Sequence, residues 1–118
     1  MSSARFMVER LRRLMAWRHY APIVARAAVE VLGRDVEVYV VGSAAEGRLT
    51  ALSDLDVLIV LPREPDPHEA LLISRRVYEK AVELGLPWDY PLDLHIAGPE
   101  SKKIYERSSR LIRVTPSA

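Results

Sequence analysis

Cysteine is absent from the 118-residue sequence. Disulfide bonds, zinc sites built from thiolates and cysteine nucleophiles are therefore excluded. Long hydrophobic runs are also missing: none reaches the roughly 20 residues that a membrane-spanning helix needs, and charged residues make up 28% of the chain. The N-terminal stretch carries arginines throughout and lacks the apolar segment and cleavage site of a signal peptide. We therefore expect a cytoplasmic protein with no membrane partner.

A strong excess of one charge is likewise missing, since the formal net charge is +1. Nothing in the overall balance calls for nucleic acid, and we expect no such partner. The local exception is the arginine-rich segment near the N-terminus. Its basic side chains could contact RNA or an acidic protein, but they fit better the solvated face of a helix that packs on the core.

The hydrophobic pattern predicts alternating helices and strands. Helical periodicity covers about residues 4–32, where we expect Pro22 to separate two helices or kink one, and Gly33 to end the segment. Runs of β-branched, aromatic and other apolar residues predict the strands. Strands are expected at 35–41, 56–61 and 91–97, a short helix with a loop at 43–52, helices at 68–84 and at about 100–108, and then a tail forming a loose strand or an arm.

This order predicts an α/β (or α+β) domain in which helices flank a small mixed β-sheet. The length suits one domain over residues 1–118, with a helical segment at 1–33, a sheet core at 34–98 and a C-terminal helix and tail at 99–118. A domain this small exposes much of its surface, so a partner subunit or a second copy of the chain would help to stabilise it.

A glycine–serine pair, Gly42-Ser43, ends the first predicted strand. Glycine lets the backbone approach a ligand closely, and the N–H groups of the helix that follows favour phosphate. The pair lacks the lysine of a P-loop and the glycine spacing of a dinucleotide fold. By itself it is a weak signal for phosphate binding.

Acidic residues at the starts of two apolar strands are a stronger signal. Asp54 and Asp56 are two apart and are expected to point to the same side of their strand. Two carboxylates placed in this way repel each other, and a magnesium ion bound between them would relieve that repulsion. If the strand that carries Asp93 lies beside it, three carboxylates converge. The alternatives left open are a capped turn at Asp54, and solvated strand residues at Asp56 and Asp93.

Together these motifs resemble the DNA polymerase β-like nucleotidyltransferase superfamily, and the short length resembles its minimal nucleotidyltransferase branch. The resemblance covers about Val36 to Ile96: Gly42-Ser43, ten residues, Asp54-Leu55-Asp56, and a later acidic strand at Asp93. Many relatives carry arginine or lysine in the turn after the glycine–serine pair. This chain has Ala44, Ala45 and Glu46 there, which puts a phosphate contact in question.

The resemblance implies a transfer of a nucleoside monophosphate, with ATP as the expected donor, to a hydroxyl. It implies two Mg²⁺ ions held by the catalytic residues Asp54, Asp56 and Asp93. It assigns nucleotide binding to Gly42, Ser43, Gly47 and Ser53. His95 shares the predicted face of Asp93, and its role stays open. Trp88 and Tyr90 could stack on a base, although hydrophobic packing fits them better.

The resemblance also suggests an acceptor. Minimal nucleotidyltransferases of this kind pair with small helical toxins of the HEPN class and add AMP to a toxin tyrosine, so the chain resembles the antitoxin half of a toxin–antitoxin system. Two alternatives remain: a partner-binding module that keeps the fold without catalysis, and an RNA-binding protein that uses the arginine-rich helix.

Overall fold

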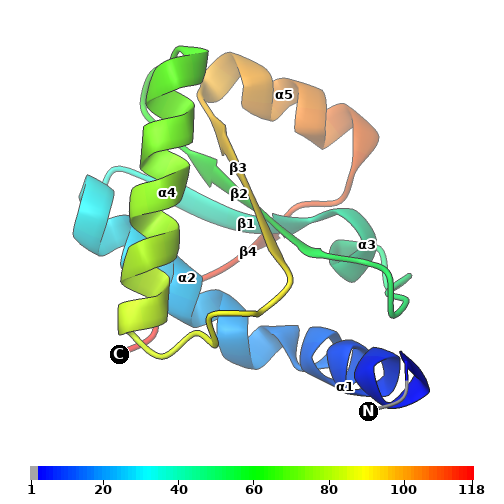
Figure 1. Ribbon diagram of the computed structural model, residues 1–118. Coiled ribbons are helices and arrows are strands. Elements are labelled where there is room, and N and C mark those ends of the chain that lie inside the picture. Colours follow the sequence, from blue (N-terminus) through cyan, green and yellow to red (C-terminus); the bar gives the residue numbers. More distant parts are fainter. Residues whose placement is uncertain (1–2) are drawn as a thin grey trace.

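The structure, a computed structural model, describes residues 3–118 (Figure 1). The predicted single domain also includes residues 1 and 2, which lie outside the described part. The helices are α1 (Ser3–Met15), α2 (Trp17–Leu32), α3 (Gly42–Ala45), α4 (Pro67–Glu83) and α5 (Pro99–Ser108). The strands are β1 (Glu37–Val41), β2 (Leu55–Val60), β3 (Leu92–Ala97) and β4 (Ile112–Arg113). This mixed α/β architecture confirms the predicted fold class.

The strands form one mixed sheet in the order β3-β2-β1-β4. The β2 and β3 strands run parallel, whereas β1 is antiparallel to both β2 and β4. A parallel pair needs a long crossover, and α4 supplies it between β2 and β3. This crossover brings two strands that are distant in sequence side by side.

The central strand β2 is apolar because both of its faces are covered. Leu55, Val57 and Ile59 are fully buried in the main core, to which α2 and α4 also contribute buried residues. Leu58 and Val60 alternate with them and belong to a smaller cluster on the opposite face. Figure 1 shows α4 and α5 on different sides of the strands. The smaller cluster includes Tyr105 of α5, so α5 covers that second face only in part.

The helical segment breaks at Ala16 and not at Pro22. Pro22 lies inside α2, because a proline there removes a single backbone hydrogen bond and the rest of the helix is anchored by burial. The predicted short helix with a loop at 43–52 is confirmed as α3 and the loop that follows it. The tail forms the short strand β4, one of its two predicted forms, so the sheet extends beyond the predicted core of 34–98.

The N-terminal helix α1 is attached mainly by side-chain contacts. Leu14 is its one buried residue within the described part of the chain. Arg13 donates a hydrogen bond to Asp89 at 2.9 Å, and Arg10 reaches the loop before β2. The prediction of a merely solvated basic face is therefore wrong for these two arginines. Within residues 3–118, no helix combines the length and the apolar character needed to cross a membrane.

Candidate active site

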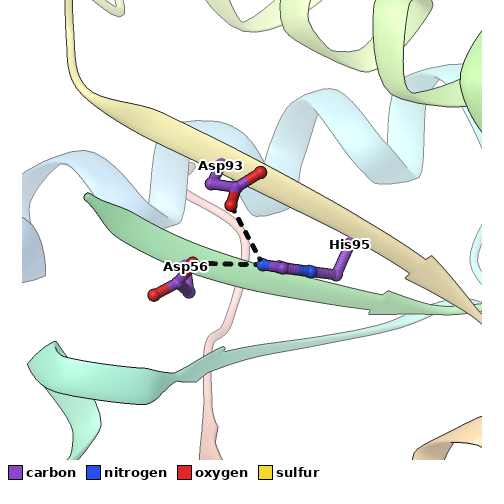
Figure 2. Close-up of side chains that lie close together, drawn as sticks. All are labelled: Asp56, Asp93 and His95. Atoms are coloured by element: carbon purple, nitrogen blue, oxygen red, sulfur yellow. Dashed lines mark hydrogen bonds and ion pairs between the residues drawn. The ribbon is translucent and has the colours of Figure 1, made fainter. Parts of the chain in front are cut away.

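The parallel pairing of β2 and β3 sets two acidic residues side by side. Asp56 is in register with Asp93, and Leu58 with His95. Side chains alternate along a strand, so Asp56, Asp93 and His95 all lie on the face that α5 covers in part. Figure 2 shows the three side chains meeting between the two strands. The sequence-based expectation that Asp56 and Asp93 converge agrees with this arrangement.

His95 lies between the two carboxylates. Its Nε2 atom is 3.1 Å from Asp56 Oδ1 and 3.5 Å from Asp93 Oδ2. The hydrogen bond with Asp56 raises the pKa of His95 above its ordinary value, although burial of the ring opposes the shift. On the other side of the ring, Nδ1 is 3.2 Å from the hydroxyl of Tyr105 on α5. The ring is thus held at both nitrogens.

The donor set of this cluster fits a divalent cation. One ligand atom from each of Asp56, Asp93 and His95 lies within 4.8 Å of the others. Two ligands at right angles around a cation, each about 2.1 Å from it, are about 3 Å apart. The Nε2–oxygen distances of 3.1 and 3.5 Å are close to that spacing. The side chains of Asp56 and Asp93 are 26% and 54% exposed, so the oxygens remain reachable from solvent.

Asp54, the other predicted metal ligand, is outside this cluster. The strand begins at Leu55, so the alternation that should align Asp54 with Asp56 does not apply. Arg10 donates instead to Asp54 Oδ1 at 2.8 Å and to the backbone carbonyls of Ala51 and Ser53. The Asp54 side chain is 51% exposed and is paired with this arginine. The structure therefore brings together two of the three predicted carboxylates.

We expect an Arg10→Gln variant to loosen the loop before β2. Glutamine cannot replace the contacts of Arg10 to two carbonyls and a carboxylate, and the loss of such bonds costs about 1–3 kcal/mol. Native-state trypsin digestion should then cleave faster after Arg48. The matched control is Arg12→Gln, because the Arg12 side chain is 72% exposed and has a 3.5 Å contact to Glu9. Equal cleavage rates in the two variants would contradict the assigned role of Arg10.

The glycine–serine pair lies directly beside the acidic cluster. Gly42 has a φ of +69°, and a Cβ at this position would lie 2.5 Å from Asp56 Oδ2. The Gly42 N–H donates to the Ser109 hydroxyl at 3.1 Å. Ser43 follows it at the start of α3, and its side chain is half-buried. A glycine is needed here because any side chain would displace the Asp56 carboxylate.

The other two predicted nucleotide-binding residues, Gly47 and Ser53, lie in the loop between α3 and β2. The Ser53 hydroxyl accepts a hydrogen bond from the Thr50 amide at 3.0 Å. Gly47 has a φ of +70° and lies in a groove shared with Arg18 and Arg110. Neither residue contacts the cluster through a bond found in the described part of the chain. Their assignment to nucleotide binding stays a prediction.

Sequence reasoning missed three contributors to this region, Arg10, Tyr105 and Ser109. It placed His95 on the face of Asp93 through the alternation of β3 and left its role open, and the structure shows the contact of His95 with Asp56. The others act across contacts that span 10 to 67 residues, and no local pattern marks them. The prediction of hydrophobic packing holds for one of the two aromatic residues before β3. Tyr90 is buried against Tyr20, whereas Trp88 is 76% exposed.

Comparison with known proteins shows the family to which the chain belongs. A family model described as a nucleotidyltransferase domain matches residues 24–113, which is most of the chain. No curated protein matches the sequence. The crystal structure of a candidate nucleotidyltransferase from Sulfolobus solfataricus is similar in fold, with a TM-score of 0.59 and 18% identity over 90% of this chain and 85% of that one. The chain therefore belongs to the nucleotidyltransferase domain family, as a minimal form of that domain.

Proposed function

We propose that the chain transfers AMP from ATP to a hydroxyl group of a partner protein, in the presence of divalent cations. The observation that carries this proposal is the register of β2 with β3, which sets Asp56 and Asp93 side by side next to Gly42. A bound divalent cation would supply charge neutralisation at the phosphoryl oxygens. The carboxylates of Asp56 and Asp93 are the residues that would hold it, together with Asp54 if nucleotide binding releases it from Arg10.

The phosphate end of the nucleotide is proposed to lie at Gly42 and Ser43. The Gly42 amide already donates to a hydroxyl oxygen, that of Ser109. A phosphate oxygen could accept the same bond. The exposed carboxylate of Asp93 is the group best placed to accept the proton of an attacking hydroxyl, because the Asp56 carboxylate is more buried.

The acceptor is proposed to be a tyrosine of a small helical HEPN-type toxin, which makes the chain its antitoxin. Two features support an acceptor supplied by another protein. The described residues form one small domain whose sheet carries the cluster on a partly open face. The chain also exposes large apolar side chains, including Phe6, Leu52 and Trp88, that a partner could cover.

The departures in the turn after Gly42 have structural explanations. Ala44 and Ala45 are buried in the main core, where an arginine or lysine would not fit. The Glu46 carboxylate accepts a hydrogen bond from the Arg110 amide at 2.8 Å and so fastens the segment after α5. These residues therefore do not favour the alternative of a partner-binding module without catalysis.

Incubating the chain with labelled ATP, Mg²⁺ or Mn²⁺ and the protein encoded beside it tests the proposal. The expected result is a covalent gain of one AMP on a tyrosine of that partner, located by mass spectrometry. The control reaction contains the Asp56→Asn variant and should leave the partner unlabelled. A tight complex that never acquires label would instead support the non-catalytic module.

A further inference from the structure

His95, and not Asp54, is the third residue of the cluster. Its Nε2 atom faces both Asp56 and Asp93, as Figure 2 shows, while Asp54 is paired with Arg10. The donor set that the backbone arranges is therefore two oxygens and one imidazole nitrogen. It is not the three-oxygen set that the sequence predicted.

The surroundings of the ring aim Nε2 at the two carboxylates. Nδ1 lies 3.2 Å from the Tyr105 hydroxyl, which can accept its N–H. Nε2 lies 3.1 Å from Asp56 Oδ1 and 3.5 Å from Asp93 Oδ2, so a metal ion bound there would take the place of the proton that Nε2 shares with the carboxylates. A hydrogen bond from the other ring nitrogen is the usual way in which metal-binding histidines are oriented. The three ligand atoms already lie within 4.8 Å of one another, so a cation could bind them with little rearrangement.

We propose that Asp56, Asp93 and His95 Nε2 together bind a first-row transition-metal ion such as Co²⁺, Zn²⁺ or Mn²⁺, and that His95 makes the site prefer such an ion over Mg²⁺. This inference rests on the proposed function, since it concerns the same site. Magnesium prefers oxygen ligands and gives up its water reluctantly. Imidazole binds the transition-metal ions much better, so a single nitrogen ligand shifts the preference.

Metal binding without nucleotide tests the preference directly. Calorimetric titrations of the chain with Co²⁺ and with Mg²⁺ are expected to show tighter binding of Co²⁺. The His95→Gln variant should lose at least about tenfold in Co²⁺ affinity and keep its weak Mg²⁺ binding. The Asp89→Asn variant is the matched control, and its Co²⁺ affinity should equal that of the parent, because the Asp89 carboxylate pairs with Arg13 outside the cluster.

A spectroscopic readout identifies the ligand atom. The chain has three histidines, His19, His68 and His95, so the ¹⁵N imidazole spectrum is simple. Zinc is expected to shift Nε2 of His95 and leave His19 and His68 unchanged. A Tyr105→Phe variant keeps the aromatic ring at position 105 but removes the hydroxyl that can accept the N–H of His95 Nδ1. It should weaken zinc binding about tenfold.

Two results would overturn this inference: equal affinity of the parent chain for Co²⁺ and Mg²⁺, or a zinc-induced shift at His19 or His68 with His95 unchanged. Because these titrations contain no nucleotide, either result leaves the labelling assay for nucleotidyl transfer unaffected. Failure of the metal preference and failure of the proposed function are thus separable.

Discussion

Replacing Asp56 with asparagine is expected to abolish nucleotidyl transfer while the fold remains intact. The change keeps the size of the side chain and removes the carboxylate that faces His95, Asp93 and Gly42. Loss of such a group should lower the rate at least about a thousandfold, which corresponds to about 4 kcal/mol of activation free energy. The rate of AMP transfer, measured with a thermal melt of the same sample, provides the check.

The stability of the Asp56→Asn variant should change little, because two effects oppose each other. The variant loses the 3.1 Å contact with His95 but also the repulsion between Asp56 and Asp93. Asp89→Asn is the matched control: it removes a carboxylate that pairs with Arg13 at 2.9 Å, outside the cluster. We expect Asp54→Asn to slow transfer as well, while its nucleotide-free metal binding stays normal. Equal transfer by Asp56→Asn and the parent chain would refute the assigned site.

The second large effect is expected for Gly42→Ala. The backbone there has a φ of +69°, which costs an alanine about 1–2 kcal/mol. In addition, the new Cβ would lie 2.5 Å from Asp56 Oδ2, so the carboxylate must move away from His95 and Asp93. We expect a modest loss of stability together with a severe loss of transfer.

Gly47→Ala separates these two contributions. Its φ of +70° imposes the same backbone strain, but nothing lies within 4 Å of the added Cβ. Both variants should therefore unfold at similarly reduced urea concentrations, whereas transfer should fail in Gly42→Ala alone. If the two variants lose transfer equally, the close approach of Gly42 to Asp56 is unimportant and strain in the turn explains the result.

Much of the fold could be predicted because local signals and tertiary packing agree. The apolar runs of β1, β2 and β3 lie within two residues of their predicted bounds. The predicted helix at 68–84 is α4, which begins at Pro67, and Asp66 caps it by accepting from the Glu69 amide at 2.8 Å. The contacts that hold the loop after α3 could not be predicted, because they come from distant side chains, among them Arg10 on α1.

The site was predictable where strand alternation applies. Asp93 and His95 share a face because they are two apart within β3, and the parallel register then adds Asp56. Alternation failed for Asp54, which precedes the strand and is held by an arginine 44 residues away. The contact of His95 with Asp56 depends on the register between two strands, and no single stretch of sequence encodes it.

The segment after Asp93 gives the site a particular order of assembly. Tyr105 holds the His95 ring, Ser109 accepts from the Gly42 amide, and Arg110 is bound by Glu46. On the ribosome, these partners are synthesised after every residue of the acidic cluster. A nascent chain that stops short of Tyr105 carries the carboxylates but lacks the groups that orient their neighbours, so translation must pass this point before the catalytic arrangement is complete.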